Sequence, residues 1–306
     1  MSYGNSGDDR LTKNARRDAA REKSRILREE QKKKDRRSKV LLQGGIILGV
    51  LGVLALVAVL LISSNRPAGP GPANMASDGI QISQGNIAST TPASPPSKPP
   101  VPNPRDTNSK AVNIQIYVDY LCPICGQFEA TNGAYISSLL DNGGATVEVH
   151  PIAILDRLSQ GTKYSTRATN AAACVANYSP NAFYAFHTAL FAKQPAENST
   201  GLTDEQIIAL ANGAKVDKAT EISDCVKNQT FKAWTTAATA RALNGPIPDS
   251  NVDKVQGTPT VIVNGLKYEG SVTDLPTFQA FVIQAAGNTF NQNSTATPTP
   301  SPTPTK

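Results

Sequence analysis

The sequence is poor in side chains that bind metals. Its 306 residues include only four cysteines and two histidines. Structural zinc needs four ligands close together in the fold. Beyond the pair Cys122 and Cys125, the candidates are single residues spread over 75 positions, namely His150, Cys174, His187 and Cys225. The sequence therefore predicts no metal site, and we expect no metal or organic cofactor.

Net charge is almost absent from most of the chain. Residues 1–39 carry 14 Lys or Arg against 7 Asp or Glu, a net charge of +7, whereas the whole chain carries +6. Positive charge is thus confined to a terminal arm, and we expect no nucleic-acid binding by the rest. The arm alternates charge signs at helical spacing, which is typical of a solvated or membrane-surface helix that sets topology. A specific cytoplasmic or nucleic-acid partner of the arm is the alternative.

Residues 40–62 contain no charged side chain and a single amide, Gln43. About 20 apolar residues in a helix cover a bilayer core of roughly 30 Å, so this run predicts one transmembrane helix. Lys and Arg on its upstream flank predict a cytoplasmic N-terminus and an extracytoplasmic remainder, in a single-pass protein of the cell membrane. A cleavable signal peptide is the alternative, but its apolar stretch is normally about 7 to 15 residues long.

Two segments are dominated by proline, serine and threonine. Residues 63–110 cannot bury enough surface to fold alone and are expected to form a semi-rigid, disordered linker. Within them, residues 79–82 alternate apolar and polar side chains and predict a short strand at a sheet edge. Residues 288–306 close with Thr-Pro and Ser-Pro repeats that are typical of a disordered or glycosylated tail. One folded domain remains, over residues 111–287.

The first part of this domain predicts a βαβ unit. Residues 112–120 alternate apolar side chains on one face, which indicates a half-buried strand. The strand ends at Cys122-Pro123-Ile124-Cys125, and a helix should follow at once because proline is favoured at the first helical position. Asn142-Gly143-Gly144 ends that helix, and residues 146–154 predict a second strand.

Helical patterns fill the segment from about 160 to 245, an all-helical insertion. The predicted helices cover residues 165–176, 181–192, 203–213, 219–226 and 231–243. Strand character returns at 260–263, and Asn264-Gly265 then turns the chain back towards Glu269, as in a β-hairpin. A last amphipathic helix is expected over 274–286.

The Cys-Pro-Ile-Cys sequence stands at the start of a predicted helix. Unpaired backbone N–H groups and the positive end of the helix dipole stabilise a thiolate there. We therefore expect a lowered pKa for Cys122 at the exposed cap position, and Cys122 is the predicted nucleophile. Cys125, one turn into the helix, should be shielded and resolve the mixed disulfide. A zinc half-site and a purely structural Cys122–Cys125 bond are the alternatives.

Three stretches together resemble the DsbA-type branch of the thioredoxin superfamily, especially the single-pass exported proteins of actinobacteria and other Gram-positive bacteria. They are Tyr117 to Cys125, the helical insertion, and Val255 to Gly265 with its Gly-Thr-Pro-Thr sequence. A Cys-Pro-x-Cys paired with a distant Gly-Thr-Pro-Thr is far more specific than Cys-x-x-Cys alone. The resemblance implies an α/β thioredoxin fold with an all-helical insertion, and a thiol–disulfide oxidoreductase.

The resemblance also implies that Thr258 and Pro259 bind substrate. In the family the proline that matches Pro259 is cis and lies beside the cysteines, and the backbone of the preceding residue pairs with the substrate segment. The sequence agrees, because a proline that opens a buried strand removes a hydrogen-bond donor and usually marks a special geometry. A proline that only shapes an edge strand is the alternative.

Two residues near the cysteines leave the chemistry open. Ile124 stands where the most strongly oxidising members of the family carry His. Its side chain offers no N–H and no charge to the Cys122 thiolate, so a less oxidising couple is expected. Asp119, three residues before Cys122, could relay protons or raise a thiol pKa by its negative charge, and a solvated strand end is the alternative.

The remaining cysteines, Cys174 and Cys225, lie on predicted helices of the insertion. Disulfides persist outside the cytoplasm, so a structural bond between them is expected, and some actinobacterial relatives resemble this arrangement. Closing a loop of 51 residues would stabilise the fold by about 4 kcal/mol in the chain-entropy model. Two unpaired core cysteines are the alternative. Trp234 is predicted to anchor the insertion to the thioredoxin core, and His187 receives no functional role.

The sequence therefore predicts an extracytoplasmic thiol–disulfide oxidoreductase that acts on exported proteins with cysteines, and the compartment favours a disulfide oxidase. An oxidase needs a membrane partner that reoxidises it, and the resemblance implies one related to vitamin K epoxide reductase. Two alternatives stay open. One is a reductase or isomerase for specific exported substrates, and the other is a non-catalytic chaperone or binding module that uses the thioredoxin-like groove.

Overall fold

The computed structural model describes residues 17–18, 20–34, 52, 69–95, 98–103 and 111–294, and the side chains among them up to residue 287. The chain divides into two compact units, Met1–Pro67 and Ala68–Lys306. In the first unit, residues 20–34 are helical and exposed. No helix among the described residues is long and apolar enough to cross a membrane. The span predicted over 40–62 lies outside the described residues, except for Gly52.

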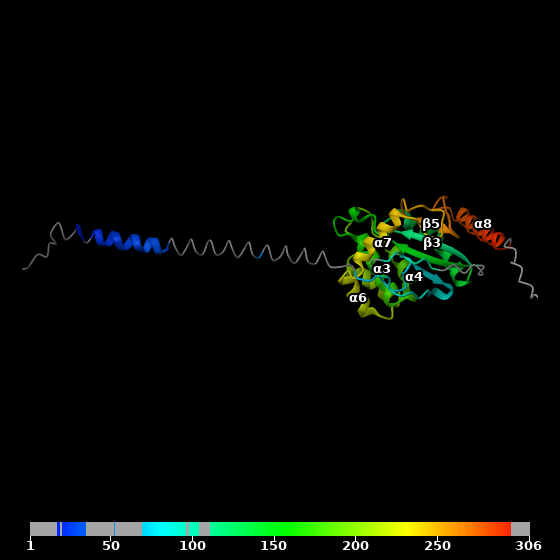
Figure 1. Cartoon of the computed structure of the whole chain (residues 1–306), viewed down its shortest axis with the longest axis horizontal. Helices are drawn as coiled ribbons and strands as arrows, with labels where there is room; N and C mark the ends of the chain where they lie inside the picture. The colour runs from blue at the N-terminus through cyan, green and yellow to red at the C-terminus, as the bar shows by residue number, and fades with distance from the viewer. Residues whose placement is uncertain are drawn as a thin grey trace, which may run out of the picture. The chain divides into compact units, whose positions relative to one another are not determined.

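The second unit is built around a six-stranded sheet with the strand order β2-β1-β4-β3-β5-β6 (Figure 1). Strands β3 and β4 are parallel, and the other neighbouring pairs are antiparallel. The strands are β1 (Ile80–Ser83), β2 (Ile87–Ala88), β3 (Val112–Val118), β4 (Ala145–Pro151), β5 (Thr260–Val263) and β6 (Leu266–Lys267).

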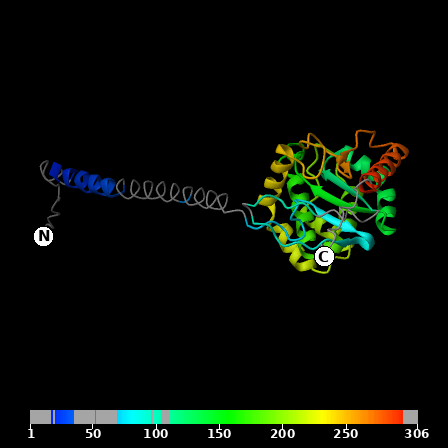
Figure 2. The same cartoon turned by 45° about the vertical axis from the view of Figure 1, so that its right-hand side comes forward.

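Helices surround this sheet, and α6 and α8 lie at opposite ends of the body in both views (Figure 2). Helix α2 joins β3 to β4, and five helices, α3 to α7, form the insertion between β4 and β5. The predicted α/β architecture with an all-helical insertion is confirmed. The helices are α2 (Pro123–Asp141), α3 (Tyr164–Tyr178), α4 (Phe183–Ala192), α5 (Asp204–Gly213), α6 (Ala219–Lys227), α7 (Lys232–Asn244) and α8 (Leu275–Ser294).

The central strand β3 is buried on both faces. Because side chains alternate along a strand, Ile116 packs in the core that contains Phe128 of α2 and Phe278 of α8, whereas Tyr117 packs with Ile247 in a second cluster. The Phe128 and Phe278 rings meet edge to face, with centroids 5.4 Å apart. Each fully buried apolar side chain contributes about 1.5–3 kcal/mol, so the strand that leads into the Cys-Pro-Ile-Cys sequence is held firmly.

The prediction of a disordered linker over 63–110 is wrong for residues 69–95 and 98–103, which pack on the domain. The strand expected at 79–82 is β1, which pairs antiparallel with β4 and buries Ile80 in the core. Asp78 accepts hydrogen bonds from the Trp234 indole at 3.2 Å and from the Arg241 guanidinium at 2.6 and 2.7 Å. Amino-acid composition gave the wrong prediction because it considers the segment by itself. In the folded protein the domain provides the surface against which the segment packs. Trp234 thereby connects α7 to the segment that enters the sheet.

The predicted tail over 288–306 also begins too early, since α8 continues to Ser294. Gly287 does not end the helix. A glycine costs a helix only about 1 kcal/mol relative to alanine, and adding residues to an existing helix is far easier than starting one. The tail beyond residue 294 lies outside the described residues.

Candidate redox site

Cys122 is the N-cap residue of α2 and follows β3 after a short turn. Its backbone is extended, and Pro123 occupies the first helical turn. The Cys122 N–H donates to the Asp119 carbonyl at 2.9 Å, and the Cys122 carbonyl accepts the Gly126 N–H at 3.2 Å. The sulfur is therefore attached where the first N–H groups of the helix have no partner within the helix.

The structure brings the four predicted site residues together. Cys122 and Cys125 are both free thiols, and the Cys122 thiol donates to the Thr258 carbonyl at 3.2 Å. The peptide bond between Thr258 and Pro259 is cis. Cys125 is 0% exposed, and Cys122 is only 6% exposed, less than its cap position suggested. The difference arises because the loop that carries Thr258 lies against the sulfur.

The two thiols have opposite electrostatic environments. A hydrogen bond from Cys125 lowers the pKa of Cys122 from 9.0 to about 6, assisted by backbone N–H groups at the start of α2. Burial favours the protonated form of Cys122, but the hydrogen-bond donors outweigh it. Burial, followed by the neighbouring Cys122, raises the pKa of Cys125 well above its usual value. The pair thus consists of one stabilised thiolate and one buried thiol.

Asp119 is a buried positioning residue and not a solvated strand end, since its side chain is 0% exposed. Its Oδ1 accepts the Leu121 N–H at 2.9 Å, and its Oδ2 accepts the N–H groups of Ile154 and Leu155 at 2.8 and 3.0 Å. Burial raises the pKa of Asp119 in spite of these hydrogen bonds. The carboxylate ties the turn before Cys122 to the segment after β4, and it ends the predicted second strand early.

Sequence reasoning missed Gln194, which follows α4. Its Nε2 donates to the carbonyls of Tyr120 and Cys122 at 3.2 and 2.8 Å and joins the insertion to the redox turn. A Cβ atom at Gly126 would overlap the Gln194 amide. Glycine inside a helix is destabilising by about 0.5–1 kcal/mol relative to alanine, so a glycine in the first turn of α2 indicates a special requirement. Gly126, directly after Cys125, was therefore the signal in the sequence that another group packs closely against this turn.

The other two cysteines lie away from this pair. Cys174 of α3 is bonded to Cys225 of α6, which links two helices of the insertion. The part of the chain that the structure describes holds no group of three or more His, Cys, Asp or Glu side chains arranged to bind a metal ion.

Comparison with known proteins assigns the family. The family described as Thioredoxin matches residues 107–282, more than half of the chain. The chain belongs to the thioredoxin family. Among solved structures, this family member is similar to the reduced disulfide bond oxidoreductase DsbG of Mycobacterium tuberculosis, with 32% identity and a TM-score of 0.52 over 75% of this chain and 96% of that one. It is also similar to oxidised DsbA of Mycobacterium tuberculosis, with 31% identity and a TM-score of 0.51 over 72% of this chain and 100% of that one.

These similarities identify a DsbA-like, thiol–disulfide oxidoreductase member of the thioredoxin family. A curated relative is the serine/threonine-protein kinase PknE of Mycobacterium tuberculosis, 34% identical over 119 residues. The match covers 38% of this chain and 21% of the kinase, so the chain spans about a fifth of the length of that relative.

Proposed function

We propose that this thioredoxin-family protein is a disulfide oxidase that transfers the Cys122–Cys125 disulfide to exported proteins. The observation that carries the proposal is the pKa of Cys122, lowered to about 6 by the hydrogen bond from Cys125 and by further donors. A stabilised thiolate favours the reduced form of the pair, which makes the disulfide a stronger oxidant. A sulfur with a low pKa is also a good leaving group when a substrate resolves the mixed disulfide.

The proposed reaction moves two electrons from the substrate to the pair. A substrate thiolate attacks the Cys122 sulfur of the disulfide, the Cys122–Cys125 bond breaks, and Cys125 leaves and takes up a proton. A second substrate thiolate then attacks the substrate sulfur of the mixed disulfide and releases the Cys122 thiolate. In the Cys122–Cys125 disulfide and in the mixed disulfide the Cys122 sulfur has no proton to donate, so the Thr258 carbonyl is free to accept a backbone N–H of the bound substrate.

Under this proposal the domain works outside the cytoplasm, held by one membrane span over residues 40–62 with the N-terminus in the cytoplasm. The uncharged run in the sequence and the Cys174–Cys225 disulfide, of a type that persists in oxidising compartments, support this location. Reoxidation then requires a quinone-linked membrane partner, and the DsbA-type sequence features support one related to vitamin K epoxide reductase.

The reduction potential of the Cys122–Cys125 pair tests the direction of electron flow. We would equilibrate the full-length chain with glutathione buffers and trap the thiols with acid. A potential of about −120 to −180 mV supports a disulfide donor or isomerase, whereas about −270 mV overturns the oxidase in favour of a reductase. We expect the less oxidising end of the first range because the side chain of Ile124, 44% exposed beside Cys122, offers no hydrogen bond to the thiolate.

Matched variants test whether the pair is the catalyst. Cys122→Ser should abolish disulfide formation in a reduced, unfolded substrate protein. The control is the double variant Cys174→Ala with Cys225→Ala, which removes two cysteines and leaves the redox pair intact. Persistent activity in Cys122→Ser, or equal loss in both variants while both remain folded, would contradict the assigned role.

A further inference from the structure

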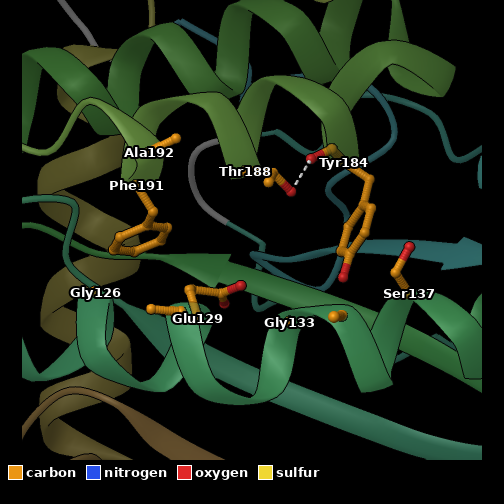
Figure 3. Close-up of a pocket in the computed structure, with 10 residues that line it drawn as sticks. Gly126, Glu129, Gly133, Ser137, Tyr184, Thr188, Phe191 and Ala192 are labelled. Carbon is orange, nitrogen blue, oxygen red and sulfur yellow. Dashed lines mark hydrogen bonds between the residues drawn. The ribbon is translucent and has the colours of Figure 1, made fainter.

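A groove of about 510 Å³ lies between α2 and α4 (Figure 3), and Gly126 in its lining directly follows Cys125 along the chain. On α2 it is lined mainly by small side chains that include Gly126, Ala130 and Gly133, and on α4 by the rings of Tyr184 and Phe191. Among the residues that line the groove, Glu129 alone carries a charge. The groove is therefore mostly apolar, with the hydroxyl groups of Ser137, Tyr184 and Thr188 and a single carboxylate in its lining.

Glu129 points from α2 into this groove (Figure 3), and its side chain is 9% exposed. Its Oε1 lies 3.1 Å from Nε2 of His187, and Nδ1 of that histidine lies 3.2 Å from the Tyr120 hydroxyl. The His187 ring thus connects the Glu129 carboxylate to the buried Tyr120 hydroxyl through its two nitrogens.

Among the described residues the His187 ring is the one hydrogen-bond partner of this carboxylate. No Lys or Arg in the described part of the chain forms an ion pair with Glu129, and its Oε2 has no hydrogen-bond partner there. A buried charge is costly unless it is paired. Neighbouring rings respond to this charge, since burial first and the Glu129 carboxylate second raise the pKa of Tyr184. The groove is thus complementary to a cation.

The carboxylate also lies on the same side of α2 as the nucleophile. Cys122, Gly126, Glu129 and Gly133 are spaced i, i+4, i+7 and i+11, which places them on one face of the helix. Seven residues of helix rise about 10 Å, and an extended peptide covers that distance in about three residues. A substrate segment that reacts at Cys122 and enters the groove would bring its third residue close to Glu129.

We infer that the groove binds the substrate segment that flanks the reactive cysteine, and that Glu129 binds a lysine or arginine side chain about three residues from that cysteine. This inference rests on the proposed function and adds a preference for basic sequences to it. The basic residue takes no part in electron transfer. It places a positive charge opposite the Glu129 carboxylate, in a groove whose lining contains no Lys or Arg.

Paired peptides test the inference on the oxidised full-length chain. Each peptide carries two cysteines, and either arginine or its uncharged isostere citrulline stands three residues before or after the first cysteine. The measured quantity is kcat/KM for the loss of peptide thiols. Samples are quenched with acid and the peptide forms are separated by chromatography. We expect arginine to be preferred about 10-fold in one of the two positions, the lower end of what a hydrogen bond to a charged group contributes.

Three variants test whether Glu129 is the group that recognises the positive charge of the peptide arginine. Glu129→Gln keeps an acceptor for His187 but removes the charge, so the preference should fall to about 1-fold. Ala130→Lys adds a cation at an exposed position on the groove and should abolish the preference with Glu129 intact. Glu221→Gln, exposed on α6, is the matched control and should keep it. Circular dichroism checks that each variant is folded.

The outcomes separate the inference from the proposed function. Turnover of all peptides without an arginine preference, or a preference that survives in both Glu129→Gln and Ala130→Lys, overturns the inference and leaves the oxidase intact. Absence of turnover with every peptide overturns the oxidase and the inference together.

Discussion

The thiol of Cys125 makes the largest contribution to the lowered pKa of Cys122, and it can be removed without altering Cys122. Cys125→Ala deletes the donor, whereas Cys125→Ser retains a hydroxyl in its place. Both variants leave Cys122 as the one free thiol. A hydrogen bond to a charged group contributes about 1.5–3 kcal/mol, and one pKa unit corresponds to about 1.4 kcal/mol. We therefore expect Cys125→Ala to raise the pKa of Cys122 from about 6 to about 7–8, and Cys125→Ser to leave it near 6.

This shift predicts a measurable change in reactivity. At pH 7 a thiol with a pKa of about 6 is about 90% thiolate, whereas pKa values of about 7 and 8 give about 50% and 10%. Alkylation of Cys122 by iodoacetamide at pH 7 should thus be about 2- to 10-fold slower in Cys125→Ala than in Cys125→Ser. Thiolate absorbance at 240 nm, recorded from pH 4 to 10, gives each pKa directly.

Two results would refute this reasoning. Equal midpoints in Cys125→Ala and Cys125→Ser would show that the Cys125 side chain does not set the pKa of Cys122. A midpoint near the free-cysteine value of about 8.5 in the wild-type chain would remove the stabilised thiolate altogether, and the main support for an oxidase with it.

Three further predictions concern stability and are measured by urea unfolding. Because the pKa of Cys122 is lower in the folded protein than in the unfolded chain, its ionisation stabilises the reduced form above the unfolded pKa, and this contribution is lost as the pH falls from about 8.5 to about 6. The oxidised form lacks this titration, so a stability difference between the two forms that is flat with pH contradicts the prediction. Changing Cys174 and Cys225 to alanine should lower the free energy of unfolding by about 4 kcal/mol with little change in reduction potential, and a large change in potential would contradict the separation of the two pairs. Asp78→Asn weakens the paired hydrogen bonds to Arg241 and should cost about 1–3 kcal/mol and speed proteolysis within residues 69–103, whereas unchanged cleavage would contradict its anchoring role.

Local patterns in the sequence were sufficient to predict most elements and the position of the redox pair. The strand expected over 260–263 is β5, and the Thr203–Gln206 capping box at the start of α5 is present. The predicted βαβ start places Cys122 at the N-cap of α2. These predictions succeeded because helix and strand periodicity, capping residues and turn residues act over a few positions along the chain.

Groups that are distant along the chain surround the site. The family resemblance predicted that Thr258, 136 residues from Cys122, lies beside it, whereas only the tertiary structure showed the Gln194 amide 72 residues from Cys122 and the His187 ring 58 residues from Glu129. Composition likewise predicted a disordered linker where residues 69–95 and 98–103 fold against the sheet. A single sequence does not specify which distant groups become neighbours. Burial, unpaired charge and the balance of hydrogen bonds on a thiol depend on those neighbours, so they arise only when the chain is folded.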